Sequence, residues 1–414
     1  MSNQSFSPKD PLRLVDRSKD RYYSIAISSV WELGKLRSAR ALVVGAGALG
    51  NEVCKNLAMM GVKMIAVLDR DTVEIANLTR SAFFREADHG RFKAEVLCER
   101  LKELNPDITA IPLVGDLNEV LGLGLLRRMD MVFSCLDSRF ARWSLNRKCE
   151  KLGVPWVDGA MENLLGEVAV YVPDQGPCYE CTLTPVEHEL LAQVVSCKGI
   201  VVTNLALGKV PTTSTMGSIV AAVQVQEAVK LLHRDFANAL VGKRLVVNAN
   251  INDFYITGAD RKPDCMAHAR YGAVTELETL SVEKASARDL LKRFRQETGQ
   301  DGAVSLGREI VFELRCGKCG IAERLGRPIY VIHEEQMRCS QCGSVRQRGM
   351  THSVSSDDPW AEWPLSRLGI PRLEVLEVQG ADSSAFYELT GDLTSFPSAV
   401  RGSDEVTPQV EILR

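Results

Sequence analysis

The sequence predicts an α/β fold with a doubly wound, mostly parallel sheet, followed by a small α+β domain. Three observations support this prediction. A strand, a glycine-rich turn, a helix and a second strand follow one another between residues 41 and 69. Further apolar strands alternate with helices up to about residue 256, and two Cys-x-x-Cys pairs follow a change of composition at Gly272. Alternation of strands and helices is typical of a parallel sheet covered by helices on both faces.

The first strand–turn–helix unit has the features of a nucleotide site. The apolar run 41–44 predicts a buried strand, and residues 51–60 predict a helix that ends at Gly61. Glycines between them let the backbone approach phosphates, and the helix N-terminus offers free N–H groups. An acid about 20 residues further on can bind ribose hydroxyls. The alternative is a tight turn kept only for packing. The expected nucleotide-binding residues of this Rossmann-like unit are Gly45, Gly47, Ala48, Gly50 and Asp69.

A polar segment follows Asp69, where a dehydrogenase would enter its next helix. It places Asn77, Arg80 and Lys93 beyond the strand end, beside the expected nucleotide. Two cations at this position suit a triphosphate or its reaction better than a dinucleotide, because they stabilise charge on the phosphates. A solvated loop with scattered charges is the alternative.

One later strand ends in Asp137. An acid at the carboxyl end of a parallel strand opens into the ligand crevice of such a sheet. It could hold magnesium, which prefers carboxylate, water and phosphate oxygens. The predicted strands are 108–114, 131–136, 154–158, 167–172, 245–247 and 254–256, and the predicted helices are 94–104, 138–152 and 217–232.

The pair Cys178 and Cys181 is matched far along the chain by Cys265 and His268 at the same spacing. A lone C-x-x-C pair suits redox chemistry or half of a zinc site, but a thioredoxin-like context is missing. Three thiolates and one imidazole form a tetrahedral zinc set, which would pin the end of the domain to its middle. In the alternative, His268 is a surface residue and Cys265 a core thiol.

Cys197 stands alone in a loop-like stretch next to Lys198. Most isolated cysteines are small buried hydrophobes, but a neighbouring cation favours the thiolate, which is the nucleophile. Cys197 is therefore a candidate reactive cysteine.

The region after Gly272 predicts a separate small domain. Residues 279–296 have amphipathic helical spacing, 310–314 form a strand, and 372–378 alternate as a half-buried strand does. Two cysteine knuckles, each followed by glycine, predict a second zinc site. Its ligands are Cys316, Cys319, Cys339 and Cys342. The expected organisation is an N-terminal arm (1–20), a nucleotide-binding domain (21–270), the small domain (271–395) and a flexible tail (396–414).

The composition limits the expected partners and location. The 50 basic and 53 acidic residues leave a net charge of -3, so neither nucleic acid nor a membrane surface is expected as a partner. No apolar run approaches the roughly 20 residues that span a bilayer, and no signal core begins the chain. We therefore expect a cytoplasmic protein whose 12 cysteines are thiols or metal ligands.

Taken together, these motifs resemble the ubiquitin-activating enzyme family and its bacterial relatives. Those relatives are the ThiF/MoeB-like adenylyltransferases, which prime sulfur-carrier proteins for thiamine and molybdopterin synthesis. The resemblance covers about residues 20–270. It rests on the turn 45–50, the D-x-D-T and N-L-x-R segments at 69–72 and 77–80, Lys93, and the Leu-Asp-Ser turn at 136–138. The second half of the family's zinc site is usually C-x-x-C and is C-x-x-H here.

The resemblance implies ATP-dependent adenylation of the C-terminal tail of a ubiquitin-like carrier protein. By the match, Asp69 would bind ribose, Asn77, Arg80 and Lys93 would hold phosphates, and Asp137 would hold magnesium. Asp71 and Ser138 would complete the cofactor-binding set. The implied catalytic residues are Arg80, Lys93, Asp137 and Cys197, and the implied cofactors are ATP, magnesium and zinc.

The position of Cys197 decides which branch of the family is expected. It lies 16 residues after Cys181, close to the thioester cysteine of conjugation-type enzymes, with a crossover segment at 198–215. Residues 364–378 resemble part of the ubiquitin-fold domain that recruits a conjugating enzyme. The resemblance thus implies a thioester on Cys197 and transfer to a conjugating enzyme. The alternative is an adenylyltransferase for a sulfur-carrier protein.

Two positions depart from the family pattern. Ser24 replaces the arginine that reaches into the partner subunit of the dimer, so Arg13, Arg17, Arg21 or another chain would have to supply that cation. Ser81 replaces a glutamine. A homodimer is still expected, and a non-catalytic nucleotide-binding scaffold is a further alternative. An NAD-dependent dehydrogenase is disfavoured because no hydride-transfer acid/base set stands out.

Overall fold

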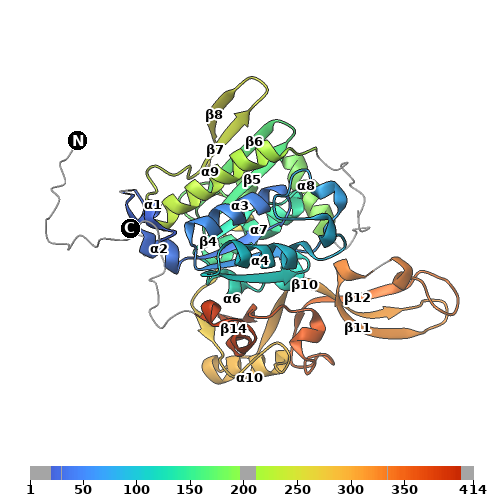
Figure 1. Cartoon of the computed structure of the whole chain (residues 1–414). Helices are drawn as coiled ribbons and strands as arrows, with labels where there is room; N and C mark the ends of the chain where they lie inside the picture. Colours follow the sequence, from blue (N-terminus) through green and yellow to red (C-terminus); the bar gives the residue numbers. More distant parts are fainter. Residues whose placement is uncertain (1–19, 29, 196–210, 333, 402–414) are drawn as a thin grey trace.

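The computed structural model describes residues 20–28, 30–195, 211–332 and 334–401, which form a larger and a smaller domain (Figure 1). The larger domain contains an eight-stranded sheet in the order β3-β2-β1-β4-β5-β6-β7-β8. The first five strands are parallel, and β6 to β8 extend the sheet antiparallel. Its strands are β1 (Arg40–Val44), β2 (Met64–Asp69), β3 (Thr109–Val114), β4 (Met131–Ser134), β5 (Trp156–Glu162), β6 (Leu165–Tyr171), β7 (Lys243–Asn248) and β8 (Asp253–Gly258).

The strand order reverses at β1. The chain passes from β1 to β2 and β3 on one side and continues with β4 and β5 on the other. The carboxyl ends of β1, β2 and β4 therefore meet at the switch point, which is where open α/β sheets bind ligands. At the outer edge, β3 contains Pro112, which has no N–H to offer a further strand.

Helices cover both faces of this sheet (Figure 1). One core joins the sheet to α3, α4 and α9, and includes Leu57, Leu97 and Val225. The other lies against α5, α6 and α7, and includes Leu145 and Trp156. The helices of this domain are α1 (Tyr23–Ala26), α2 (Leu33–Ser38), α3 (Ala48–Met60), α4 (Lys93–Leu104), α5 (Leu117–Val120), α6 (Leu123–Leu126), α7 (Arg139–Leu152), α8 (Pro185–Val195) and α9 (Ser214–Leu232).

The smaller domain has a six-stranded sheet in the order β11-β10-β13-β14-β9, with β12 also paired to β10. Its amphipathic helix α10 buries Leu290 and Phe294 against the sheet. The far half of β10 forms a projecting lobe with β11 and β12 (Figure 1). Its elements are β9 (Val274–Glu276), α10 (Ala287–Thr298), β10 (Gly302–Arg315), β11 (Ala322–Pro328), β12 (Gln347–Val354), β13 (Val375–Gly380), β14 (Ser384–Glu388) and α11 (Ser398–Arg401).

The two domains dock through a close backbone contact. The N–H of Gly124 donates to the carbonyl of Leu373 at 2.7 Å. A Cβ on Gly122 would lie 2.1 Å from the carbonyl oxygen of Arg372, so only glycine permits this approach. The carboxylate of Glu388, which is fully buried, pairs with both Arg127 and Arg128. These contacts pack the two domains against each other.

The α/β architecture predicted from the sequence is confirmed, and several boundaries differ. Helix α3 begins at Ala48, three residues before the expected start. The chain also remains packed beyond residue 395, because Val400 of α11 is fully buried in the core of the larger domain. The rest of the expected tail, after residue 401, lies outside the described residues. No helix of the described chain combines the length and apolar character needed to cross a bilayer.

Candidate active site

The glycine turn shows which glycines are needed for its shape. Gly45 has a φ of +102°, and a Cβ there would meet the carbonyl oxygen of Cys135 at 2.4 Å. A Cβ on Gly50 would lie 1.9 Å from the carbonyl oxygen of Gly45. Gly47 is different, since nothing lies within 4 Å of its Cβ position and no side chain caps α3 behind it. Open space over an uncapped helix N-terminus fits a phosphate group.

Asp69 fixes this turn from the end of β2. Its Oδ2 accepts the N–H of Ala46 at 2.6 Å, and its Oδ1 accepts the N–H of Asp71 at 2.7 Å. Burial raises the pKa of the Asp69 carboxyl, and the two backbone donors partly offset that effect. Each carboxylate oxygen can accept a second hydrogen bond, so the group can hold the turn and still bind a hydroxyl.

Between Asp71 and Lys93 the chain forms a long loop that closes on itself, and we call this loop, residues 72–92, the excursion. The ends of the excursion are joined by the N–H of Val73, which donates to the carbonyl of Arg91 at 2.8 Å. This pairing places the Lys93 ammonium 3.1 Å from the Asp71 carboxylate, with only 12% of the Lys93 side chain exposed. A partly shielded cation thus pairs with Asp71, the carboxylate two residues past Asp69.

The other residues of the excursion have local roles in this structure. Asn77 is buried, and its side-chain oxygen accepts the N–H of Glu74 at 2.9 Å. Arg80 donates to the carbonyl of Ala76 at 2.7 Å, so its guanidinium retains further donors. Ser81 is buried, and its hydroxyl has no hydrogen-bond partner among the described residues.

Asn51 is a site residue that sequence reasoning missed. Its fully buried amide donates to the carbonyls of Ala46 and Gly47 at 2.9 and 3.0 Å, and its oxygen accepts the N–H of Phe83 at 3.1 Å. Asn51 therefore ties the excursion to the glycine turn. The available signal was a polar residue immediately after the turn, in a helix otherwise facing the core.

Asp137 lies exposed beyond β4, two residues after Cys135, whose backbone borders Gly45, and Ser138 caps α7. A buried ion pair supports this loop. Arg142 donates to Asp158 at 2.9 Å, to the carbonyl of Gly159 at 3.1 Å and to the carbonyl of Leu136. Sequence reasoning did not assign Arg142 or Asp158 to the site. Both residues follow Asp137 in the sequence, but no sequence pattern indicated that their side chains are buried and paired.

The first predicted metal set comes together in space. The Cys178 sulfur lies 3.8 Å from that of Cys181 and 3.7 Å from that of Cys265, and His268 Nε2 lies 3.4 Å from the Cys181 sulfur. Four such ligands at about 3.8 Å from one another match a tetrahedral zinc ion bound at about 2.3 Å. The set could hold a metal ion, and its four protein ligands would leave no open position for catalysis.

The second metal set lies at the tip of the projecting lobe. Sulfur–sulfur distances of 3.5 Å (Cys316–Cys319), 3.6 Å (Cys316–Cys342) and 3.6 Å (Cys319–Cys339) join its four cysteines. This group could also hold a metal ion. All four of these ligands come from the projecting lobe of the smaller domain, so the role of a metal ion there would be to order the lobe.

Two features predicted from the sequence, the reactive Cys197 and a site role for Arg21, are not part of the observed site. Cys197, with most of the expected crossover segment, lies outside the described residues. Arg21 donates to the carbonyl of Leu104 at 3.2 Å, and Tyr22 is buried against Gly61 at the C-terminal end of α3. Since α3 has 13 residues, this end lies about 20 Å from the glycine turn. Arg21 does not reach the site of its own chain.

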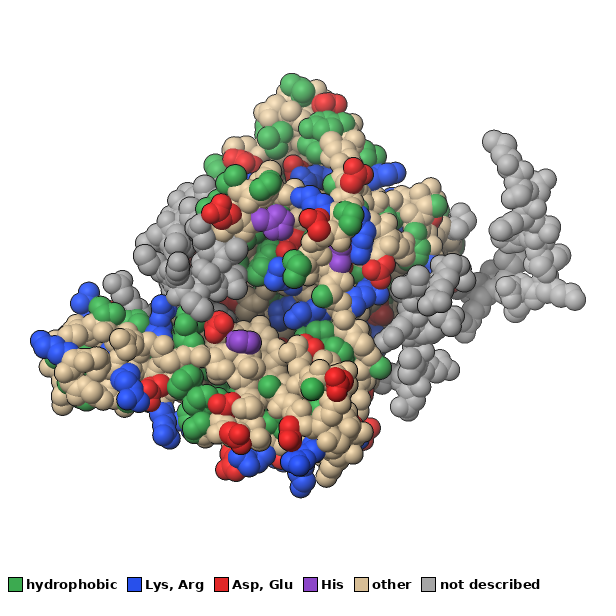
Figure 2. Space-filling view, turned by 180° about the vertical axis from the view of Figure 1, so that it is seen from behind, with side chains coloured by type: hydrophobic (Ala, Val, Ile, Leu, Met, Phe, Trp, Pro, Cys, Tyr) green, Lys and Arg blue, Asp and Glu red, His purple; other side chains and the backbone are tan. Residues whose placement is uncertain are grey.

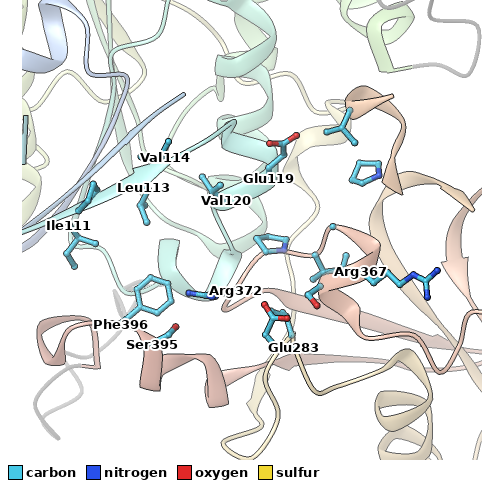
Figure 3. A pocket seen from close by; sticks show the side chains of 18 of the residues that line it. Ile111, Leu113, Val114, Glu119, Val120, Glu283, Arg367, Arg372, Ser395 and Phe396 are labelled. Carbon is cyan, nitrogen blue, oxygen red and sulfur yellow. The ribbon is translucent and has the colours of Figure 1, made fainter. Parts of the chain in front are cut away.

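A cavity lies at the junction of the two domains. It has a volume of about 690 Å³ and lies between the domains. Figure 3 shows Val114, Glu119 and Val120 on one wall and Arg372 and Phe396 on the other. The cavity belongs to the domain junction and not to the glycine turn.

Comparison with known proteins decides the family. Residues 21–267 match the model of the ThiF family. The chain belongs to the ThiF family. A SAMP-activating enzyme E1 of Haloferax volcanii is 34% identical over 254 residues, which are 61% of this chain and 88% of that protein. The adenylyltransferase and sulfurtransferase MOCS3 of Bos taurus is 31% identical over 278 residues, 66% of this chain and 58% of that protein.

One solved structure of similar fold is E. coli MccB with ATP, at 23% identity and a TM-score of 0.47, covering 57% of this chain and 68% of that one. The family match ends at residue 267, so the smaller domain lies outside it. Relatives named adenylyltransferases and activating enzymes support an enzymatic role for this ThiF-family chain.

Proposed function

We propose that this ThiF-family protein activates a ubiquitin-like carrier in two steps. In the first, a carboxylate oxygen of the carrier's C-terminus attacks the α-phosphorus of ATP, and pyrophosphate leaves. In the second, the Cys197 thiolate attacks the carrier's acyl carbon, a C–S bond forms and AMP leaves. A conjugating enzyme bound by the smaller domain would then receive the carrier, and the protein would act as a homodimer.

The arrangement at the sheet switch point is the observation that carries the adenylation step. The reaction brings two anions together, so cations supply most of the assistance. Lys93 is held beside Asp71 at 3.1 Å, and Arg80 lies on the segment that Asn51 ties to the glycine turn. Asp137 would hold magnesium at the end of β4, where the metal would neutralise phosphate charge.

An exposed sheet edge supports a protein substrate. All six residues of β8 are exposed, and the hairpin projects from the domain (Figure 1). Hydrophobic side chains gather on it in Figure 2, and they include Ile251, Phe254 and Ile256 at 68%, 56% and 58% exposure. Exposed apolar groups on one projecting edge are typical of a protein contact. We propose this hairpin as the carrier's docking surface.

A sulfur-carrier substrate is the second candidate. The MOCS3 relative is named both an adenylyltransferase and a sulfurtransferase. Adenylation would be the same, and a sulfur donor would replace Cys197 as the attacking group. A carrier that ends as a thiocarboxylate, without transfer to a conjugating enzyme, would favour this candidate.

The test mixes this protein with a small ubiquitin-like protein that ends in a glycine-rich C-terminal tail. With ATP and magnesium, we expect carrier-dependent exchange of pyrophosphate into ATP, and a thiol-sensitive adduct on a non-reducing gel. Cys197→Ala should lose the adduct and keep the exchange, whereas the matched variant Cys98→Ala, at a buried thiol of α4, should keep both. An adduct that survives Cys197→Ala would refute the thioester step. Absence of exchange in the unaltered protein would refute adenylation.

A further inference from the structure

One arginine of the smaller domain reaches into the larger one. Arg308 lies in β10 after Gly307, which has a φ of +65°, where the pairing with β12 shifts between Ser305 and Ile310. Such a bulge redirects a side chain out of the ladder. The Arg308 guanidinium donates to the carbonyl of Asn118 at 2.6 Å and to the carbonyl of Gly369 at 3.0 Å. Only 10% of this side chain is exposed.

The Glu374 carboxylate also pairs with the Arg308 guanidinium. One of its oxygens lies 3.4 Å from Arg308, and the other accepts the N–H of Leu123 at 3.1 Å. Both side chains are almost fully buried. Charge-assisted hydrogen bonds between buried groups are strong and fix geometry, so Arg308 holds the Asn118 carbonyl firmly.

Asn118 is connected to the end of β2 through short-range hydrogen bonds and an ion pair. Its N–H donates to Asp116 at 2.9 Å, and the same carboxylate pairs with Arg70 at 3.3 Å. The N–H of Gly115 donates to the carbonyl of Asp69 at 3.2 Å. The loop 115–118 therefore connects the residue that Arg308 grips to Asp69.

The segments on both sides of the loop 115–118 border the cavity between the domains. Val114 on one side of the loop, and Glu119 and Val120 on the other, line the cavity (Figure 3). Because the segments that flank the loop border this cavity, the bond from Arg308 to the Asn118 carbonyl helps to fix the position of the loop.

We propose that Arg308 is a positioning residue for nucleotide binding, through which the smaller domain completes the ATP site. It acts through Asn118 on the position of Asp69 and touches no reacting atom. This inference rests on the proposed function, because it assumes that Asp69 binds the nucleoside half of ATP.

The test measures equilibrium binding of ATP and of AMP to the full chain by calorimetry. Arg308→Met should raise the Kd for both nucleotides at least fivefold and by similar factors, because AMP retains the nucleoside. The matched control is Arg127→Met, which breaks a different ion pair of the same domain interface and should change Kd less than twofold. If Arg308→Met fails to fold, Arg308→Lys keeps the charge but loses the forked geometry.

Three results would be decisive. Weaker binding in the Arg308 variant alone, with an unchanged far-ultraviolet circular dichroism spectrum, supports the inference. Equal Kd values in the Arg308 variant and the unaltered protein, or equal losses in both variants, overturn it. If the unaltered protein binds no ATP, the proposed function itself fails, which is distinguishable from the second result.

Discussion

The carboxylate of Asp69 accepts the backbone N–H of Ala46 at 2.6 Å, across 23 residues of sequence. The acid that ends β2 thus fixes the shape of the turn that ends β1. In a ligand-free site this bond pre-organises the glycine turn, so binding need not order it.

We expect Asp69→Asn to weaken ATP binding by on the order of tenfold, since the loss of one charged hydrogen bond is worth about 1.5–3 kcal/mol. An amide presents one acceptor oxygen, and its NH₂ group faces a backbone donor. Calorimetric Kd values would check this expectation. Asp382→Asn, at an exposed turn of the smaller domain, is the control and should bind ATP normally.

The pKa of Asp69 also predicts a pH dependence. Burial places this pKa above the usual value, so lowering the pH from 7 to 5 protonates the carboxyl earlier than an exposed aspartate. Protonation removes acceptor capacity, and ATP affinity should therefore fall with pH. ATP titrates too, so the difference between the unaltered protein and Asp69→Asn is the relevant quantity. Parallel pH profiles for the two proteins would contradict the prediction.

The buried pair Arg142 and Asp158 should have two separable effects. One is on the free energy of unfolding, and the other is on magnesium binding by the Asp137 loop. Arg142→Met leaves Asp158 unpaired, so we expect a loss of about 3–5 kcal/mol in the free energy of unfolding. The double variant Arg142→Met, Asp158→Leu should recover much of that loss. Neither variant restores the bond to the Leu136 carbonyl, so both should need more magnesium for pyrophosphate exchange. Urea denaturation and magnesium titration test the two parts.

Loss of the first metal set should destabilise the larger domain, whereas loss of the second should not. We expect two zinc ions per chain by elemental analysis and one in either Cys178→Ser or Cys316→Ser. Cys178→Ser unties residues 178–181 from residues 265–268, so it should lower the melting temperature of the larger domain. Cys316→Ser should leave that transition unchanged and retain ATP binding. Equal thermal effects of the two variants would contradict this division.

Gly122 should be indispensable for domain docking. A Cβ there meets backbone atoms at 2.1 Å, and we expect Gly122→Ala to cost about 1–3 kcal/mol as overpacking. Faster limited proteolysis between the domains would report the loss. Gly34→Ala is the matched control, because nothing lies within 4 Å of its Cβ position. Proteolysis at the same rate in both variants would refute the role of Gly122.

Much of the candidate site could be predicted from sequence because its signals are local. A strand, three glycines, a helix and Asp69 lie within one continuous stretch of sequence. The backbone geometry of such a strand–turn–helix–strand unit brings the glycine turn and the acid together. Cysteine spacing likewise identified both metal sets, since ligands at C-x-x-C spacing fit one ion. Asn51 and Arg142 were missed because their roles depend on burial, which single positions do not reveal.

The α/β class, the ThiF-family membership and the types of metal ligand can be read from the amino-acid sequence, since they follow from short-range patterns. The meeting of Arg308 and Glu374 of one domain with Asn118 and Leu123 of the other is visible only in the folded protein. Those contacts join residues about 190 to 250 positions apart. Their formation depends on how two separately patterned surfaces pack, and no local periodicity encodes that packing.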